Sequence, residues 1–438
     1  MLGGVFMRDT DGNIGSGPAP STEKVTGLLF DISKQSNFFT SGAGQALKEK
    51  LEGNVIELNS MDDLKELGIV PGTNEPENDL LFGIPYYHIE HFFNIQGANG
   101  RLFIMFADCG TNWDAIDQMQ RAAHGMINQL GVWTEQNLWN QTDPEAGTYS
   151  VDIVTALQSK AVALADDNAP LSIILSANSA ILKTKDSTSK QIDLSKIPPC
   201  QIDARYVSVI IGQGLDSEVT KMQKANKENC TPVGTIGALL GCLAKASVQE
   251  SFAWVNKFNL VGYFPDIEMG FGDVSEAEDG FKSTLKYSSL NKVQLDLLDD
   301  KGYIFLCKYS GLESGVFFSK DQTCANTTSD YRTIARNRTI NKSRRAVRNA
   351  LLPYVNSPLK VDPSTGYLSP AKITTFQNIV KDVLMTMQDN EEISGCSVNI
   401  DKNQNVLKND TLIIKYSLVP VGVATKIDVI EGLALTNK

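Results

Sequence analysis

Apolar runs and helical patterns alternate along the first three quarters of the chain. The apolar runs are short and dense enough for buried strands, and the stretches between them carry apolar residues at spacings of three and four. The predicted strands are 25–32, 54–58, 101–107, 171–175, 206–211 and 302–309, and the predicted helices are 42–51, a short helix capped by Ser60 with Asp63, 86–95, 115–130, 150–166 and 235–247. A polar loop is expected at 71–79. This alternation predicts an α/β (α+β) fold.

The pattern changes near residue 325, which predicts a domain boundary there. Residues 331–355 and 370–388 have helical patterns, and a turn rich in Pro, Ser and Gly separates them. A β-rich tail follows, and its apolar residues recur with the period of two that is typical of strands. They are Leu412, Ile414, Tyr416 and Leu418 in a first strand, and Val423, Thr425, Ile427, Val429, Leu433 and Leu435 in a second. An apolar strand at a chain end needs a partner sheet, which another copy of the chain could supply.

The composition is that of a soluble globular protein. The chain has 438 residues, of which 42% are hydrophobic and 21% are charged. Its net charge of −11 argues against general binding of nucleic acid or of an anionic membrane, because both need a basic surface. Its 7 cysteines are scattered without a C-x-x-C pair, which favours unpaired thiols in a reducing compartment. We find no signal peptide pattern and no apolar stretch of bilayer length, so no membrane insertion is expected.

The motifs that resemble chemical sites are weak. His88 and His91 share a helix face, but aromatic neighbours favour a packed core over a metal site. The segment 212–214 has two glycines after a strand, yet Ser217 replaces the third glycine of a dinucleotide loop, which favours a plain turn. The segment 9–13 lacks the glutamate of a calcium loop and reads as a turn. With no P-loop and no nucleophile elbow, the sequence predicts no enzyme and no cofactor.

Basic residues are concentrated in one helical stretch of this acidic chain. They are Arg332, Arg336, Arg338, Lys342, Arg344, Arg345 and Arg348. Several lie three or four residues apart, and like charges at these spacings repel unless a partner neutralises them. Two interpretations stay open: a solvated helix face, or a charge contact with another chain. Acidic residues for such a contact are present at Asp299, Asp300, Asp389, Glu391 and Glu392.

The order of segments resembles that of contractile tail sheath proteins of bacteriophages, R-type pyocins and contractile injection systems. Residues 55–68 are similar to the family's strand, serine cap and short helix ending in glycine, and 91–105 to its aromatic helix, glycine turn and buried strand. Residues 331–348 resemble its arginine-rich helix, 376–387 the next helix, 395–405 the strand and Asn turn, and 412–433 the closing strands. The N-terminus lacks the family's proline-containing opening, and 177–229 matches nothing in it.

The resemblance implies a homo-oligomeric structural protein. Six copies would form a ring, rings would stack helically around an inner tail tube protein, and contraction would drive the tube through a cell envelope. Baseplate and tail terminator proteins would be further partners, with no direct contact to nucleic acid. The implied location is a virion tail that assembles in the bacterial cytoplasm.

The resemblance also implies domains and site residues. We expect an N-terminal arm (1–24), an α/β sheath body (25–325) with an outward-facing insertion around 177–300, an inner assembly domain (326–420) and a C-terminal arm (421–438). The expected strand contacts between subunits are Val25, Leu412, Ile414, Tyr416, Ile427, Val429 and Leu433. The candidate charge contacts to the tube or to a neighbouring subunit are Arg338, Lys342, Arg344, Arg345, Arg348, Asp389, Glu391 and Glu392.

Three alternatives compete with a phage tail sheath. The chain could be the sheath of a type VI or extracellular injection system, an α/β enzyme with a swapped terminal strand, or a non-contractile structural module. An enzyme would need a polar pocket with perturbed titratable groups, and the sequence offers no candidate set.

Overall fold

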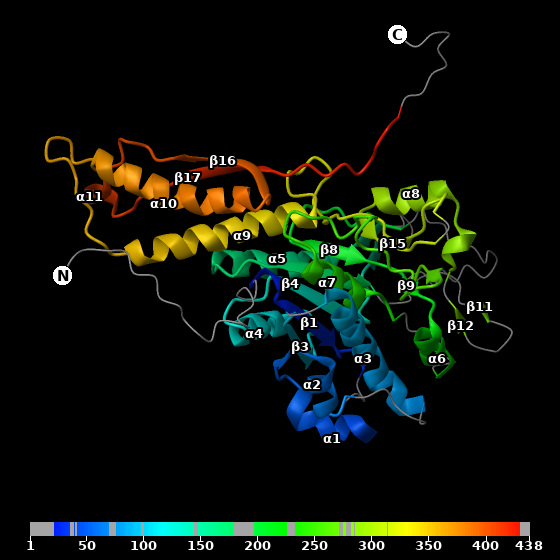
Figure 1. Ribbon diagram of the computed structural model, residues 1–438. Helices are drawn as coiled ribbons and strands as arrows, with labels where there is room; N and C mark the ends of the chain where they lie inside the picture. The colour runs from blue at the N-terminus through cyan, green and yellow to red at the C-terminus, as the bar shows by residue number, and fades with distance from the viewer. Residues whose placement is uncertain are drawn as a thin grey trace, which may run out of the picture.

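A seven-stranded sheet covered by helices on both faces forms the body of the protein (Figure 1). The computed structural model describes residues 22–35, 39, 42–69, 76–97, 100–143, 148–177, 197–225, 233–270, 275–276, 282–283, 285–312 and 314–429. The strands, in their spatial order, are β13 (Tyr303–Ile304), β8 (Val207–Ile210), β7 (Ser172–Ala177), β4 (Gln129–Thr134), β1 (Thr26–Asp31), β3 (Leu102–Ala107) and β2 (Ile56–Leu58). Neighbouring strands are parallel except for β2, which is antiparallel to β3 at the edge.

Helices bury both faces of this sheet. The body helices are α1 (Gly42–Leu51), α2 (Met61–Glu66), α3 (Pro76–Gln96), α4 (Asp114–Ala122), α5 (Asp152–Asp166), α6 (Ser217–Ala225), α7 (Ile236–Lys245) and α8 (Lys292–Asp300). One apolar core lies on the side of α4 and α5, where Ile116 and Leu157 pack against strand residues such as Ile173. The other lies on the side of α3 and α7 and includes Phe92 and Leu240. A sheet covered on both faces explains why its strands read as continuous apolar runs.

Helices α3 and α7 pack unusually closely because α7 has glycines on the contact face. A Cβ added to Gly237 would lie 2.0 Å from the carbonyl oxygen of His88, and one added to Gly241 would lie 2.9 Å from the Cβ of Ile95. Any side chain at these two positions would therefore separate the helices.

Short elements complete the body. They are the two-stranded pairs β5 (Asn140–Asp143) with β6 (Thr148–Ser150), β9 (Gln213–Gly214) with β10 (Ile267–Glu268), β11 (Ser275–Glu276) with β12 (Lys282–Ser283) and β14 (Leu306–Cys307) with β15 (Phe317–Phe318), and the 3-10 turns Thr22–Lys24 and Tyr287–Ser289.

The C-terminal module, residues 334–420, is a two-helix layer with a small sheet. It comprises α9 (Ile334–Leu351), a 3-10 turn (Leu352–Tyr354), α10 (Pro370–Asp389), β16 (Ile393–Asn399), α11 (Val406–Asn409) and β17 (Lys415–Pro420). Helix α9 lies between the body and the rest of the module (Figure 1). The antiparallel pair β16–β17 covers α10 and encloses two small apolar clusters around Leu384 and Phe376.

The structure confirms the α/β fold class and most of the predicted elements. Helix α1 matches its predicted range of 42–51 at both ends. Ser60 and Asp63 form the predicted capping box at the start of α2. Helix α9 begins three residues after its predicted start, and α10 begins at its predicted residue, Pro370.

The helix predicted over 115–130 is wrong in its second half. Helix α4 ends at Ala122 because His124 and Gly125 adopt positive φ angles of 52° and 75°, and the chain then enters β4. Positive φ is incompatible with a right-handed helix. The apolar residues after this turn belong to a central strand of the sheet.

Other expectations about the body also need correction. The range 177–300 is not an outward-facing insertion as a whole, since β8 lies within the central sheet and α7 packs on α3. The polar loop predicted over 71–79 is too long, because α3 begins at Pro76. The predicted turn at 9–13 lies outside the described residues.

Candidate functional site: the basic helix and the C-terminal sheet

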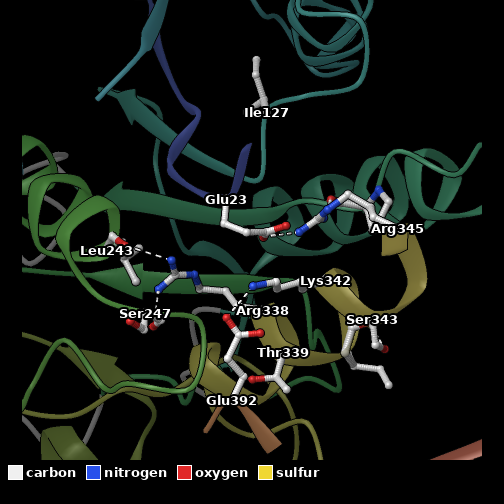
Figure 2. Close-up of polar contacts among 12 residues, drawn as sticks. Glu23, Ile127, Leu243, Ser247, Arg338, Thr339, Lys342, Ser343, Arg345 and Glu392 are labelled. Atoms are coloured by element: carbon white, nitrogen blue, oxygen red, sulfur yellow. Dashed lines mark hydrogen bonds and ion pairs between the residues drawn. The ribbon is translucent and has the colours of Figure 1, made fainter. Parts of the chain in front are cut away.

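Arg338, predicted as a contact to the tube or to another subunit, is buried inside the chain. Only 3% of it is exposed. Its guanidinium donates hydrogen bonds to the carbonyl oxygens of Leu243 (2.9 Å), Ala246 (3.2 Å) and Ser247 (3.4 Å) at the end of α7 (Figure 2). A cation at this position satisfies the last carbonyls of a helix and interacts favourably with its dipole. The predicted external role of Arg338 is therefore wrong, because its donors are used to join α9 to the body.

Two further cations of α9 form ion pairs within the chain. Lys342 pairs with Glu392 at the start of β16, and Arg345 pairs with Glu23 in the turn before β1 (Figure 2). Arg345 also donates to the carbonyl oxygen of Pro170 at 3.2 Å. Sequence reasoning selected Lys342 and Glu392 but expected a contact between subunits, whereas the structure pairs them in one chain.

Asp321, a residue of the body, binds the first turn of α9. Its carboxylate accepts hydrogen bonds from the backbone N–H groups of Ile334 (3.0 Å) and Ala335 (3.2 Å). Complete burial raises the pKa of Asp321 to about 6, although these two N–H groups and Arg338 act in the opposite direction. Burial likewise lowers the pKa of Arg338, against the opposing effect of Glu23 and Asp321. Asp321 and Glu23 had no signal in the sequence, because no pattern there indicates that either carboxylate packs against α9.

The remaining predicted charges are accessible. The Arg344 guanidinium donates to the Tyr206 hydroxyl at 2.9 Å, and Arg348 is exposed. Asp389 and Glu391 are also exposed, and in the described part of the chain neither forms an ion pair. Arg344, Arg348, Asp389 and Glu391 are thus the charges of the original set that stay available to another molecule.

The C-terminal sheet shows the period of two that the sequence predicted. Leu412, Ile414, Tyr416 and Leu418 are half-buried against the apolar clusters of α9 and α10, while Ile413 and Val419 are 56% and 58% exposed. Within the described residues, β16 and β17 pair only with each other, so each has an outer edge with no strand beside it.

The segment after β17 differs from its prediction. Residues 421–429 contain no strand, and the side chains of Ile427 and Val429 are 80% and 82% exposed. After β17 the chain leaves the module (Figure 1). Val421 and Val423 in this segment line a cavity together with residues of the body and of α9. Leu433 lies outside the described residues.

Val25 does not belong to an arm between subunits. It is 2% exposed and lies in the core of its own body, directly before β1. A side chain that is already buried cannot pack against a neighbouring subunit, so this expectation is wrong.

The edge of the sheet where an α/β enzyme would bind its ligand is occupied by a polar network. Strand β1 lies between β3 and β4, and ligands of open parallel sheets bind beyond the carboxyl ends of strands at such a point. Here the buried carboxylate of Asp31 accepts hydrogen bonds from the Cys109 N–H (3.1 Å), the Thr134 hydroxyl (2.6 Å) and the Gln136 amide (2.7 Å). Burial raises the pKa of the adjacent Cys109 thiol, which keeps it protonated and unreactive.

The two histidines have structural roles. His88 donates through Nε2 to the carbonyl oxygen of Val233 (2.9 Å) and accepts at Nδ1 from the Gly237 N–H (3.4 Å). Burial lowers the pKa of His88 to about 3, so it stays neutral. His91 bonds the carbonyl oxygen of Tyr87 at 2.8 Å. In the described ranges, no three His, Cys, Asp or Glu side chains are grouped so that they could hold a metal ion.

Two further predictions can be compared with the described ranges. Gly212 has a φ of 86°, but residues 213–214 form the short strand β9, which pairs with β10, so the plain turn expected over 212–214 is wrong for its last two residues. No helix in the described part of the chain is long and apolar enough to cross a membrane.

Comparison of the sequence with protein families places both parts of the chain. The DUF2586 N-terminal domain matches residues 2–322, and the DUF2586 C-terminal domain matches residues 330–438. The chain belongs to the DUF2586 family. The two matched ranges leave residues 323–329 between them. No curated protein matches the sequence.

The DUF2586 chain has the fold of contractile sheath proteins. It is similar over 98% of its length to 98% of a chain in the helical sheath of the anti-feeding prophage (AFP) in the contracted state, with 15% identity and a TM-score of 0.54. A chain of the AFP baseplate gives 15% identity, a TM-score of 0.55 and 99% coverage of both chains. The contracted sheath complex of PVC, an extracellular contractile injection system, gives 12% identity, a TM-score of 0.53, and coverage of 99% of this chain and 98% of that one.

Proposed function

We propose that this DUF2586 chain is the structural subunit of a contractile sheath. Six copies form a ring, and the rings stack helically around an inner tube and shorten to drive that tube through a cell envelope. The observation that carries the proposal is the likeness of fold over 98% of both chains to a protein that forms a helical sheath in its contracted state. Likeness over the full length of both chains includes the body and the C-terminal module together.

The C-terminal sheet supports assembly by strand addition. The outer edges of β16 and β17 have no neighbouring strand among the described residues, and the exposed apolar side chains of 423–429 follow directly. In such additions, main-chain hydrogen bonds give affinity and alternate side chains give specificity. The segment 421–438, and the segment 1–21, are proposed to pair with the sheets of neighbouring copies.

The contacts of α9 support movement of each subunit as a rigid unit. Arg338, Arg345 and Asp321 fix this helix to the body, so that the C-terminal module and the body move together. The terminal segments would then act as hinges between rigid subunits during contraction. The energy would come from a kinetically trapped extended state that relaxes to one with larger interfaces, which requires no nucleotide.

The further partners follow from this role. They are an inner tube protein, a baseplate and a tail terminator, and the assembled object is a particle tail built in the bacterial cytoplasm. The similarity to AFP and PVC supports an injection system as an alternative to a phage tail for the particle that contains this sheath. Genes for a capsid next to this one would indicate a phage, and their absence an injection system.

Removal of residues 421–438 tests the assembly. We expect the intact chain to form tubes on expression and the shortened chain to remain unassembled, because the donated strand is lost. The measurement is the pelleted fraction after ultracentrifugation, with negative-stain micrographs of the pellet.

A matched pair of variants separates strand addition from simple shortening. Changing Val423, Ile427 and Val429 to Ser alters apolar side chains that are at least 50% exposed and should prevent tubes without unfolding the subunit. Lys426→Gln with Asp428→Asn changes the exposed ion pair between them and should leave tubes intact. Normal tubes from the shortened chain would show that these residues are not the connector.

A further inference from the structure

A basic cavity lies at the seam between the body and the C-terminal module. Its volume is about 390 Å³, and it is bounded by the end of α5, the start of β8, the last turns of α9 and β17. Arg205, Arg344, Arg345 and Arg348 line it, together with Tyr206 and Tyr416. On a chain of net charge −11, this is a local concentration of positive charge.

Two of these arginines are held together without a carboxylate. Arg205 and Arg344 donate to the same acceptor, the Tyr206 hydroxyl, at 2.7 Å and 2.9 Å. The Arg205 guanidinium also stacks on the rings of Tyr206 and Tyr331, with distances of 4.6 Å and 4.5 Å from Cζ to the ring centroids. Cation–π contacts and a shared hydroxyl hold the guanidiniums in place but do not neutralise their charge.

The other two arginines add unused donors. Arg345 is paired with Glu23, yet its buried Nε–H has no hydrogen-bond partner. Arg348 is exposed and forms no ion pair with any described residue. Asp166 is the acid that lines the cavity, and it too forms no ion pair in the described ranges. The cavity is therefore lined by more cations than acids, and the Arg345 Nε–H beside it lacks a hydrogen-bond partner.

We infer that this seam cavity binds the acidic segment 389–391 of a neighbouring copy of the chain, an inference that rests on the proposed sheath function. Guanidinium groups present planar pairs of N–H donors that match the two oxygens of a carboxylate. Asp389 is exposed as the last residue of α10, and Glu391 is exposed in the turn that follows, where it adopts a φ of 58°. The adjacent Glu392 is already paired with Lys342, which leaves Asp389 and Glu391 for an external partner.

The proposed contact lies between two subunits, because Asp389 and Glu391 do not line the cavity of their own chain. A cavity on one copy and a complementary segment elsewhere on the next copy give a head-to-tail contact that repeats along an assembly. Charge pairs of this kind set register and partner choice between copies.

A charge-swap series tests the inference. Arg348→Glu, and separately Asp389→Lys with Glu391→Lys, should each lower the pelleted tube fraction at least about tenfold, since an attractive charge contact between copies then becomes a repulsive one. All three changes in one chain should raise the fraction at least about threefold above that of the Asp389→Lys with Glu391→Lys variant, because an acid then replaces one of the cations that repel the two new lysines. Lys381→Glu makes the same change of charge on an exposed residue of α10 and should have no effect.

Inorganic phosphate tests whether the arginines of the seam cavity bind an anion during tube formation. At matched ionic strength, phosphate should inhibit tube formation by the intact protein more than chloride does, because it competes for the arginines. If Arg348→Glu does not fold by circular dichroism, Arg348→Gln is measured in its place. Normal tubes from the Arg348 variant, or no rescue by the swap, would overturn the inference and leave the sheath function standing. Absence of tubes from the intact chain would overturn both.

Discussion

Arg338 is a charged residue that the sequence pattern predicts to be exposed and that the structure buries inside the protein. Its spacing from Lys342 and Arg345 suggested one basic stripe, whereas its side chain satisfies the three carbonyl groups that end α7. Periodicity gives the face of a helix but not what packs against that face. Burial of Arg338 therefore could not be predicted without the position of α7.

Replacement of Arg338 should be costly. Arg338→Met keeps a long apolar stem but leaves buried carbonyl groups without donors, so the free energy of unfolding should fall by about 2–4 kcal/mol. Urea denaturation followed by circular dichroism measures it. Arg332→Met, the same change at an exposed position before α9, should cost less than about 0.5 kcal/mol. A similar loss for both variants would contradict the capping role.

Asp321 gives a prediction about pH. Its pKa is raised to about 6 in the folded protein from the ordinary value of 3.8, so between these two values the folded state holds a proton that the unfolded state has lost. The contribution of this group to stability is therefore full below about pH 4 and declines as the pH rises through about 6.

Comparison of the wild type with the Asp321→Asn variant isolates the contribution of Asp321 to the pH dependence of stability. The free energy of unfolding of the wild type, relative to the variant, should fall by roughly 2–3 kcal/mol between pH 4 and pH 7, since each unit of pKa shift corresponds to about 1.4 kcal/mol. Urea titrations at a series of pH values measure the difference. A difference that is constant with pH, or that rises, would show that Asp321 is not buried with a raised pKa.

At the scale of elements, the β17 strand is the part that the sequence described best. Alternation along 412–418 predicted which side chains face the helices, and the structure confirms it. The helix end at Ala122 was missed because the apolar spacing was read on past His124 and Gly125, two residues that tolerate the positive φ with which they make the turn. The second tail strand was predicted from the same period of two, but residues 421–429 contain no strand within the single chain.

Adjacent residues of β17 test its orientation. Leu418→Asp places a carboxylate against the cluster of α9 and α10 and should reduce the stability of the C-terminal module by about 1–3 kcal/mol. Val419→Asp makes the same change on the exposed face, where the side chain is 58% exposed, and should cost less than about 0.5 kcal/mol. Protection of α10 amides from hydrogen exchange is the readout. Equal effects would mean that the strand has no preferred face.

At the scale of the whole molecule, the order of segments predicted the fold better than any motif did. The family resemblance covered the body and the module, and the structure confirms the sheath fold over both. The seam between them was not predictable, because the segment of Arg205 and Tyr206 and the segment of Glu23 meet α9 only in the folded chain. The range 177–300 was assigned outside the body because residues 177–229 matched nothing in the family resemblance, although β8 and α7 within that range belong to the body.

The most direct test of the sheath function is negative-stain electron microscopy of the intact protein after expression and purification. The proposed function predicts hollow tubes with a helical repeat, and rings of six subunits in views along the tube axis. Compact particles of one or two copies at every protein concentration, with no tubes or rings, would contradict it.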